Sequence, residues 1–173
     1  MAKVAMVVAS GFEQGEMTIL CKALAEDGHR LVVVSPKKHS VRSWDNTHWN
    51  GDIPVDVAAI DAEAQDFAAL VLPGGLIGAD TLRADEPIIR LVRDAAIQGK
   101  PVAALGHAVW VLIEAGLAKG RTMTSAPAIR SDVVHAGATW QDAAAVEDGK
   151  VITGRHGHDV VSFAELVRKL AGR

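Results

Sequence analysis

The sequence contains no tyrosine, a single cysteine (Cys21) and few aromatic residues, which make up 4% of its 173 positions. One cysteine excludes an intrachain disulfide, in agreement with the reducing environment of the cytoplasm. Lysine and arginine never form a run longer than two residues and the net charge is −3, so the composition disfavours nucleic-acid binding. No apolar run approaches the roughly 18–20 residues that a membrane span needs. We therefore expect a cytoplasmic protein that binds neither nucleic acid nor membrane.

Hydrophobic residues make up 49% of the chain, enough for residues 1–173 to fold as one domain around a single core. The first residues, MAKVAMVVAS, lack the basic region, the long apolar region and the cleavage site of a secretory signal. We expect a first β-strand there instead.

Apolar runs of strand length alternate with segments that have the apolar spacing of a helix. The expected strands are 3–9, 30–36, 67–75 and 100–106, and the expected helices are 16–27, 87–98, 110–115 and 160–170. A small β-hairpin is expected around Asp148-Gly149. Residues 43–56 form an irregular insertion, whose Trp44 and Trp49 indicate an interface or a site wall. The alternation predicts an α/β fold, a doubly wound three-layer α/β/α sandwich with a mostly parallel sheet.

Ligands of such folds bind beyond the carboxyl ends of the parallel strands. The segments at those ends are 11–16, 73–80, 106–107, 125–127 and 154–158. Glu16 is expected on the inner face of the first helix, and Glu13 in solvent. His156 and His158, like His48, lack the spacing of a metal motif and are expected to be solvated loop residues. The stretch LPGGLIGAD lacks a nucleotide-binding pattern. We therefore expect no metal and no other cofactor.

Several motifs occur in an order and spacing that resemble the ThiJ/PfpI family, within the class I glutamine amidotransferase-like superfamily. The matching stretches are GFEQGEM, VSPKKHSVRSWDNTHWNGDIPVD, ALVLPGG, LRADEPIIRLVRDAAIQGKPVAALGHAVWVLIEAGLAKGRTMTS, DVVHAGATW and VEDGKVITGR. The branch with the greatest similarity is that of the PfpI-type intracellular proteases, which are also described as glyoxalases and protein deglycases. The resemblance implies a flavodoxin-like fold and a homodimer or a larger homo-oligomer.

The same resemblance implies a site built on a Cys-His pair at a sharp strand-to-helix turn. Glu16 matches the carboxylate beside the thiol, and His107 matches the histidine that follows the nucleophile. Asp80 matches an acidic residue that a neighbouring subunit contributes, and it equally fits a residue at the N-terminus of a helix with no role in the site. Gly106 stands at the nucleophile position. The sequence also departs from the family pattern at Ala108-Val109, where Gly-Pro is usual, at Ala126, where tyrosine is usual, and at Gly157, where proline is usual.

A glycine at such a turn adopts a positive φ without the strain of about 1–3 kcal/mol that another residue carries. It leaves a small volume lined by backbone N–H groups, which suits an anion or a polarised carbonyl. The residues expected around such a small-molecule ligand are Gly74, Gly75, Gly106, Ala108, Ser125 and Trp49. Cys21 is expected to be buried on a different face of the helix from Glu16. Ser125 has no evident acid–base partner. Neither residue is therefore an obvious nucleophile in place of the missing cysteine.

Three functions follow from these residues. The first is a family member without cysteine-dependent protease, glyoxalase or deglycase activity, which acts as a small-molecule-binding, scaffolding or stress-related protein. The second is an enzyme of the lyase, hydratase or isomerase type, which uses Glu16 and His107 as acid and base on a small carbonyl compound. The third is an ordinary family hydrolase or glyoxalase that carries an engineered Cys-to-Gly change.

Overall fold

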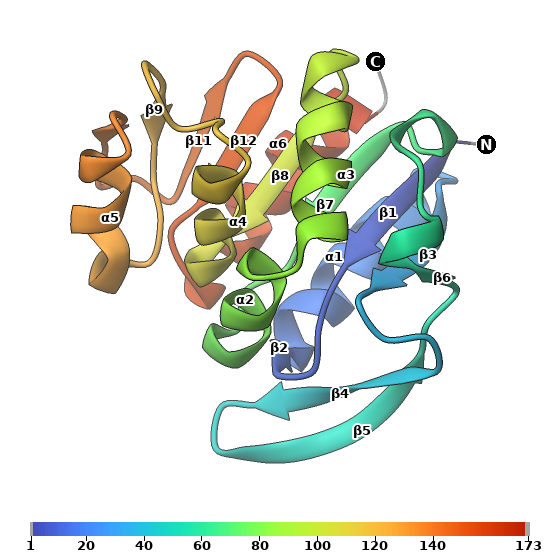
Figure 1. Cartoon of the computed structure of the whole chain (residues 1–173). Helices are drawn as coiled ribbons and strands as arrows, with labels where there is room; N and C mark the ends of the chain where they lie inside the picture. Colours follow the sequence, from blue (N-terminus) through green and yellow to red (C-terminus); the bar gives the residue numbers. More distant parts are fainter. Residues whose placement is uncertain (1, 172–173) are drawn as a thin grey trace.

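The computed structural model describes residues 2–171. Its core is a seven-stranded sheet with the order β11-β12-β8-β7-β1-β3-β6 (Figure 1). The strands are β1 (Lys3–Val7), β3 (Arg30–Ser35), β6 (Val57–Ala58), β7 (Ala69–Leu72), β8 (Val102–Leu105), β11 (Ala145–Asp148) and β12 (Val151–Gly154). Strand β11 runs antiparallel to β12, and the other neighbouring strands run parallel. The predicted α/β fold with a mostly parallel sheet is confirmed.

Helices cover both faces of this sheet, and successive residues of β1 show why. Val4 and Met6 face a cluster with α1 (Gln14–Glu26) and α6 (Val160–Ala171), whereas Ala5 and Val7 face a cluster with α3 (Glu86–Ile97) and α4 (Val109–Glu114). Side chains alternate between the faces of a strand, so a central strand must be apolar at every position. Figure 1 shows α3 and α4 in front of the sheet, with α1 and α6 behind it. None of the helices between residues 2 and 171 has the length and apolar character needed to span a bilayer.

The sequence suggested that residues 43–56 are irregular, and this was wrong. Most of the segment forms a β-hairpin. Strands β4 (Ser40–Asp45) and β5 (His48–Pro54) pair antiparallel, and β2 (Phe12–Glu13) pairs with β4. The rings of Trp44 and Trp49 pack edge to face across the hairpin, with centroids 5.4 Å apart. Both faces of β5 carry exposed residues, so its sequence lacks the alternation that identifies a half-buried strand.

Two helices, α2 (Leu76–Arg83) and α5 (Arg130–His135), are absent from the sequence-based expectation. Helix α2 lies within the glycine-rich stretch after β7. Gly75 has φ 116° and turns the chain from the strand into this helix. Gly78 lies inside α2, where a Cβ atom would come within 3.0 Å of the Ala9 carbonyl oxygen. The glycines of this stretch therefore allow close packing of a helix against the loop after β1.

Gly75→Ala is expected to lower the free energy of unfolding by about 3–5 kcal/mol, because it combines backbone strain with overpacking. A Cβ atom at Gly75 would overlap the Gly11 carbonyl oxygen and come within 2.9 Å of the Glu13 nitrogen. The measurement is urea unfolding of the wild type and of Gly75→Ala. Gly51→Ala is the matched control, since a Cβ atom at Gly51 meets nothing within 4 Å. Equal midpoints for the two variants would contradict this account.

Candidate functional site

A pocket of about 520 Å³ lies where β7, β8 and β12 end and α1 begins. Fifteen residues line it: Glu13, Gly15, Glu16, Ile19, Asn46, Gly74, Gly75, Leu76, Gly106, His107, Ala126, His156, Gly157, His158 and Val160. This position agrees with the rule that α/β folds bind ligands at the carboxyl ends of their strands.

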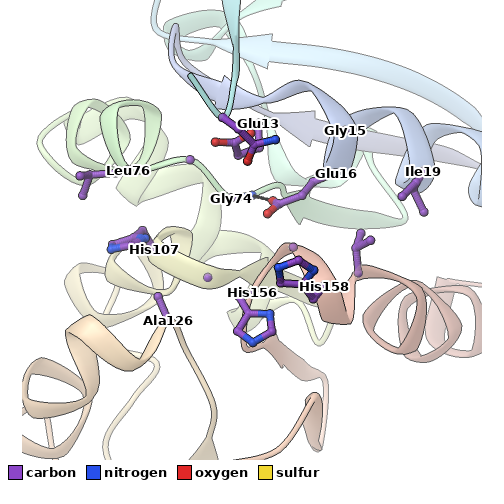
Figure 2. A pocket seen from close by; sticks show the side chains of 15 residues that line it. Glu13, Gly15, Glu16, Ile19, Gly74, Leu76, His107, Ala126, His156 and His158 are labelled. Atoms are coloured by element: carbon purple, nitrogen blue, oxygen red, sulfur yellow. Dashed lines mark hydrogen bonds between the residues drawn. The ribbon is translucent and has the colours of Figure 1, made fainter. Parts of the chain in front are cut away.

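Glu16 lies in the first turn of α1, and its carboxylate reaches the loop after β7. The backbone N–H of Gly74 donates a hydrogen bond of 2.6 Å to its Oε2 atom, the dashed line in Figure 2. A Cβ atom at Gly74 would lie 2.5 Å from Oε2, and one at Gly157 would lie 3.0 Å from Oε1. Glycine at these two positions therefore makes room for the carboxylate.

Burial raises the pKa of Glu16 from an ordinary value of 4.5 to about 7. The hydrogen bond from the Gly74 N–H opposes this rise, and the charge of Glu13 adds to it. A carboxyl group with such a pKa exchanges its proton near neutral pH, which is what a general acid or base needs.

Gly106 follows β8 with φ 62°, which confirms the positive φ predicted for the turn. The chain continues through a short 3₁₀ turn (Gly106–Ala108) into α4. Within residues 2–171, and apart from its chain neighbours, a Cβ atom at Gly106 would meet one atom within 4 Å, the Arg155 carbonyl oxygen at 3.8 Å. A side chain at this position therefore has space, although the backbone would be strained.

His107 lines the same pocket and packs against Trp110, whose ring centroid lies 5.3 Å away. Trp110 is itself held in place, because its Nε1 donates a 2.7 Å hydrogen bond to Asp132 and the Arg83 guanidinium lies 4.4 Å from its ring centroid. Burial lowers the pKa of His107. The imidazole is therefore neutral at pH 7, a state in which it can accept a proton.

Glu13 also lines the pocket, whereas the sequence placed it in solvent. It lies in β2, directly before α1 (Figure 2). Asn46, at the tip of the β4–β5 hairpin, also lines the pocket. Burial raises the pKa of Glu13, the Asn46 backbone N–H opposes the rise, and Asp45 adds to it. The pairing of β2 with β4 places these residues together. The sequence of neither segment by itself indicates that the two strands pair.

His156 and His158 follow β12 and line the opposite side of the pocket (Figure 2). Their rings pack edge to face, with centroids 5.4 Å apart. Nδ1 of His156 lies 3.1 Å from a carboxylate oxygen of Asp159, without the alignment of a hydrogen bond. Arg155 is not among the lining residues, and it donates hydrogen bonds to Asp159 at 2.9 Å and to Asp142 at 2.7 Å. His158 is exposed, as predicted, but both histidines contribute to the site.

The profile of the DJ-1/PfpI family matches residues 2–170. The chain belongs to the DJ-1/PfpI family. It is 36% identical to the deglycase TK1284 of Thermococcus kodakarensis and 33% identical to the deglycase PfpI of Pyrococcus furiosus, in each case over 97% of this chain and 98% of the relative. It is also 34% identical to general stress protein 18 of Bacillus subtilis, over 93% of this chain and 92% of that protein.

Solved structures of DJ-1/PfpI proteins share the fold. A two-domain protein from Anabaena variabilis with DJ-1/ThiJ/PfpI-like and ferritin-like domains superposes with a TM-score of 0.92 and 32% identity. The similarity covers 99% of this chain and 48% of that chain, so this protein spans about half of the two-domain protein. The C103A mutant of the DJ-1 superfamily protein STM1931 from Salmonella typhimurium gives a TM-score of 0.83 with 29% identity, over 99% of this chain and 91% of that one.

Two residues that were expected at the site, Asp80 from the family resemblance and Trp49 from its place in the 43–56 segment, lie outside the pocket lining. The side chain of Asp80 is 64% exposed on α2 and forms a 3.0 Å ion pair with Arg83. Its role in the site of a neighbouring subunit therefore stays a prediction. Trp49 packs on Trp44 in the hairpin, and of this hairpin only Asn46 lines the pocket.

Ala108 and Ser125 do not line the pocket either, because both are fully buried. Ala108 is part of the core on the α3–α4 face of the sheet. Ser125 accepts a 3.0 Å hydrogen bond from Nε1 of Trp140 and donates one of 2.9 Å to the carbonyl oxygen of Ala126. Ser125 thus supports Ala126, its neighbour in the pocket wall.

The single cysteine lies elsewhere in the structure. Cys21 is half-buried on α1, packs against the core on the α1–α6 face of the sheet, and is not part of the pocket lining. Burial raises the pKa of its thiol, so the thiolate form is scarce at neutral pH. Across residues 2–171, no three His, Cys, Asp or Glu side chains are grouped in a way that could hold a metal ion.

Proposed function

We propose that this DJ-1/PfpI protein binds a small molecule in the Glu16 pocket and lacks the cysteine-dependent protease, glyoxalase and deglycase activities. One observation carries the proposal: the pocket contains Glu16 and His107, but the only cysteine of the chain, Cys21, is not part of its lining. Thiol chemistry needs a thiolate at the bound substrate.

Gly106 stands, on this proposal, where the family has its nucleophile. The positive φ and the free space at Gly106 support this assignment, because they are the features of a turn that presents a nucleophile. The similarity to general stress protein 18 supports a role in a stress response.

The test is consumption of methylglyoxal and hydrolysis of a peptide by the wild-type protein, with the deglycase TK1284 as the active reference. We expect no turnover above the rate without protein. A Cys21→Ser variant controls for the remaining thiol, and it should behave as the wild type does. Turnover by the wild type comparable to that of TK1284 would overturn the proposal.

The near-neutral pKa of Glu16 favours a second candidate, an enzyme that moves protons on a small enolisable carbonyl compound. Glu16 and the neutral His107 would be the acid and base. This candidate predicts deuterium exchange into dihydroxyacetone in D₂O that resists iodoacetamide and is lost in both Glu16→Gln and His107→Ala. Absence of exchange with the wild type, or unchanged exchange in both variants, removes it.

A homodimer or a larger assembly is also part of the proposal. Leu76 and Ile77 on α2 are 54% and 43% exposed, and they share this helix with the exposed Asp80. An interface there would cover this apolar surface. Sedimentation velocity is expected to give the mass of at least two chains for the wild type and of one chain for Ile77→Glu. A monomeric wild type would contradict it.

A further inference from the structure

We infer that Asn50, in strand β5 of the β4–β5 hairpin, is a site of spontaneous covalent modification, where the asparagine becomes aspartate and isoaspartate through a cyclic imide. Asn46 and Asn50 are the two asparagines of the sequence, and Asn50 is the one that a glycine follows. The reaction takes place in the hairpin and does not depend on the function proposed for the pocket.

The reaction joins the backbone nitrogen of Gly51 to the side-chain carbon Cγ of Asn50. The nitrogen loses its proton to hydroxide and forms a bond to Cγ, and the Cγ–Nδ2 bond then breaks as ammonia leaves with a proton from water. Water opens the resulting five-membered imide. Cleavage between Cγ and the nitrogen gives aspartate, whereas cleavage at the main-chain carbonyl gives isoaspartate, in which the chain continues through the side chain. The net change is one water consumed and one ammonia released.

A β-bulge places the two reacting groups close together. Between the paired positions 42–52 and 44–49, the single residue Ser43 of β4 faces two residues of β5, Asn50 and Gly51, and such an extra residue interrupts the regular ladder. Here the Gly51 N–H donates a 2.8 Å hydrogen bond to Oδ1 of Asn50. Because a C=O bond is about 1.23 Å long, the nitrogen lies within about 4 Å of Cγ. The bulge thus directs the attacking nitrogen to the amide that it attacks.

Exposure and the absence of a side chain at Gly51 leave the reaction unobstructed. Both faces of β5 carry exposed residues, and β5 is the outer strand of the hairpin in Figure 1. Water and hydroxide therefore reach this segment. Within residues 2–171, even a Cβ atom at Gly51 would meet nothing within 4 Å. Glycine also has the widest choice of backbone conformations, so its nitrogen can approach Cγ without a steric conflict.

Asn46, at the tip of the same hairpin, offers a comparison within the molecule. The residue after it is Thr47, whose branched side chain is restricted in its conformations. The Thr47 N–H donates to the carbonyl oxygen of Asp45, so it is directed away from the Asn46 side chain. We therefore expect Asn46 to keep its amide while Asn50 loses it.

Arg42 favours isoaspartate over aspartate as the product. Its Nε donates a 3.0 Å hydrogen bond to the main-chain carbonyl oxygen of Asn50. Opening of the imide at this carbonyl gives isoaspartate, and a guanidinium there polarises the carbonyl and stabilises the carboxylate that forms. Arg42→Gln should therefore lower the share of isoaspartate in the product. An unchanged share would overturn this role of Arg42.

The modification changes both the charge and the length of β5. Either product adds a negative charge. Isoaspartate also adds a methylene to the backbone before Gly51, whose carbonyl oxygen accepts a 2.9 Å hydrogen bond from Oγ of Ser43. The isoaspartate form therefore pairs less well with β4, in the hairpin whose tip residue Asn46 lines the pocket.

The test follows the full-length protein during incubation at pH 6 and pH 8 at 37 °C. Fragment mass spectrometry of the tryptic peptide 43–83 assigns amide loss to Asn50 or to Asn46, and an isoaspartyl methyltransferase measures isoaspartate. A free peptide of residues 46–54 gives the rate without the fold. We expect Asn50 to lose a share of its amide comparable to that of the peptide, faster at pH 8 than at pH 6, while Asn46 stays intact.

Two variants locate the chemistry. Gly51→Ala keeps the fold, because its Cβ has room, and it should slow amide loss roughly tenfold, because the methyl group obstructs the nitrogen and restricts the backbone. Asn50→Gln removes the reactive residue, and the methyl acceptance that remains in it measures the Asp-Gly pairs 27–28 and 148–149. The wild type should accept more.

The inference is overturned by any of three results. Retention of the Asn50 amide while the free peptide loses its own would show that the strand protects the residue. Equal rates in the wild type and Gly51→Ala would exclude the cyclic imide. Equal methyl acceptance in the wild type and Asn50→Gln would place isoaspartate elsewhere in the chain.

Discussion

Gly106→Cys is expected to consume methylglyoxal about 10²-fold faster than the rate without protein, which is also the rate expected of the wild type; this is the usual scale for one added catalytic group. The new side chain has room, because in the described part of the chain its Cβ would have one atom within 4 Å apart from its chain neighbours, the Arg155 carbonyl oxygen at 3.8 Å. The pocket already contains Glu16, whose pKa of about 7 suits proton exchange with a thiol, and His107. The measurement is loss of methylglyoxal in the two proteins side by side.

Gly106→Ala is the matched control for this variant. Both substitutions place a Cβ atom on a residue with φ 62° and should lower the free energy of unfolding by about 1–3 kcal/mol. Only the cysteine adds a nucleophile, so activity in both variants would show that the effect is not thiol chemistry. A folded, inactive Gly106→Cys would contradict the idea that the site lacks only its nucleophile, and attention would pass to Ala126 and Gly157.

The sheet could be predicted from the sequence because its central strands are buried on both faces. Strands β7, β8 and β12 are buried at every position, and such strands must be continuous apolar runs, which are visible in one sequence. The β4–β5 hairpin need not be a continuous apolar run, because β5 is largely exposed. Helix α2 was missed because glycines disfavour a helix locally, whereas here Gly75 and Gly78 permit its close packing.

The site was predictable only where it depends on the end of a strand. Gly106 and Gly74 follow strands β8 and β7, and chain order alone therefore brings them to one edge of the sheet. Ser125 also follows a strand, β9 (Thr122–Met123), but its hydrogen bonds to Trp140 and Ala126 hold it in the interior. Glu13 enters the pocket through the pairing of β2 with β4, and this long-range contact leaves no local pattern in the sequence.

The second large effect is expected in stability. When the pH is raised from 5 to 8, the free energy of unfolding of the wild type should fall by about 2–3 kcal/mol more than that of Glu16→Gln. The pKa of Glu16 is about 7 in the folded protein, above its ordinary value of 4.5. Between these values the folded state binds more protons than the unfolded state, so the stabilisation is complete below pH 4.5 and is lost as the pH rises through 7.

Glu16→Gln keeps a side-chain oxygen that can accept the hydrogen bond from Gly74, but it does not titrate. Urea unfolding of both proteins at pH 5 and pH 8 gives the change in the free energy of unfolding with pH for each protein. Subtracting the change of Glu16→Gln from that of the wild type cancels the contributions of the other titrating groups. Glu114→Gln, an exposed carboxylate on α4, is the control and should show the same pH dependence as the wild type.

The sign of this effect separates two roles of Glu16. A carboxylate held mainly by its hydrogen bond from Gly74 would have a lowered pKa, and the wild type would then gain stability as the pH rises. The pocket instead keeps Glu16 largely protonated below pH 7 because burial outweighs that hydrogen bond. Equal pH dependence of the wild type and Glu16→Gln would show that Glu16 is solvated in the folded protein, and it would remove the basis for its exchange of a proton with a ligand.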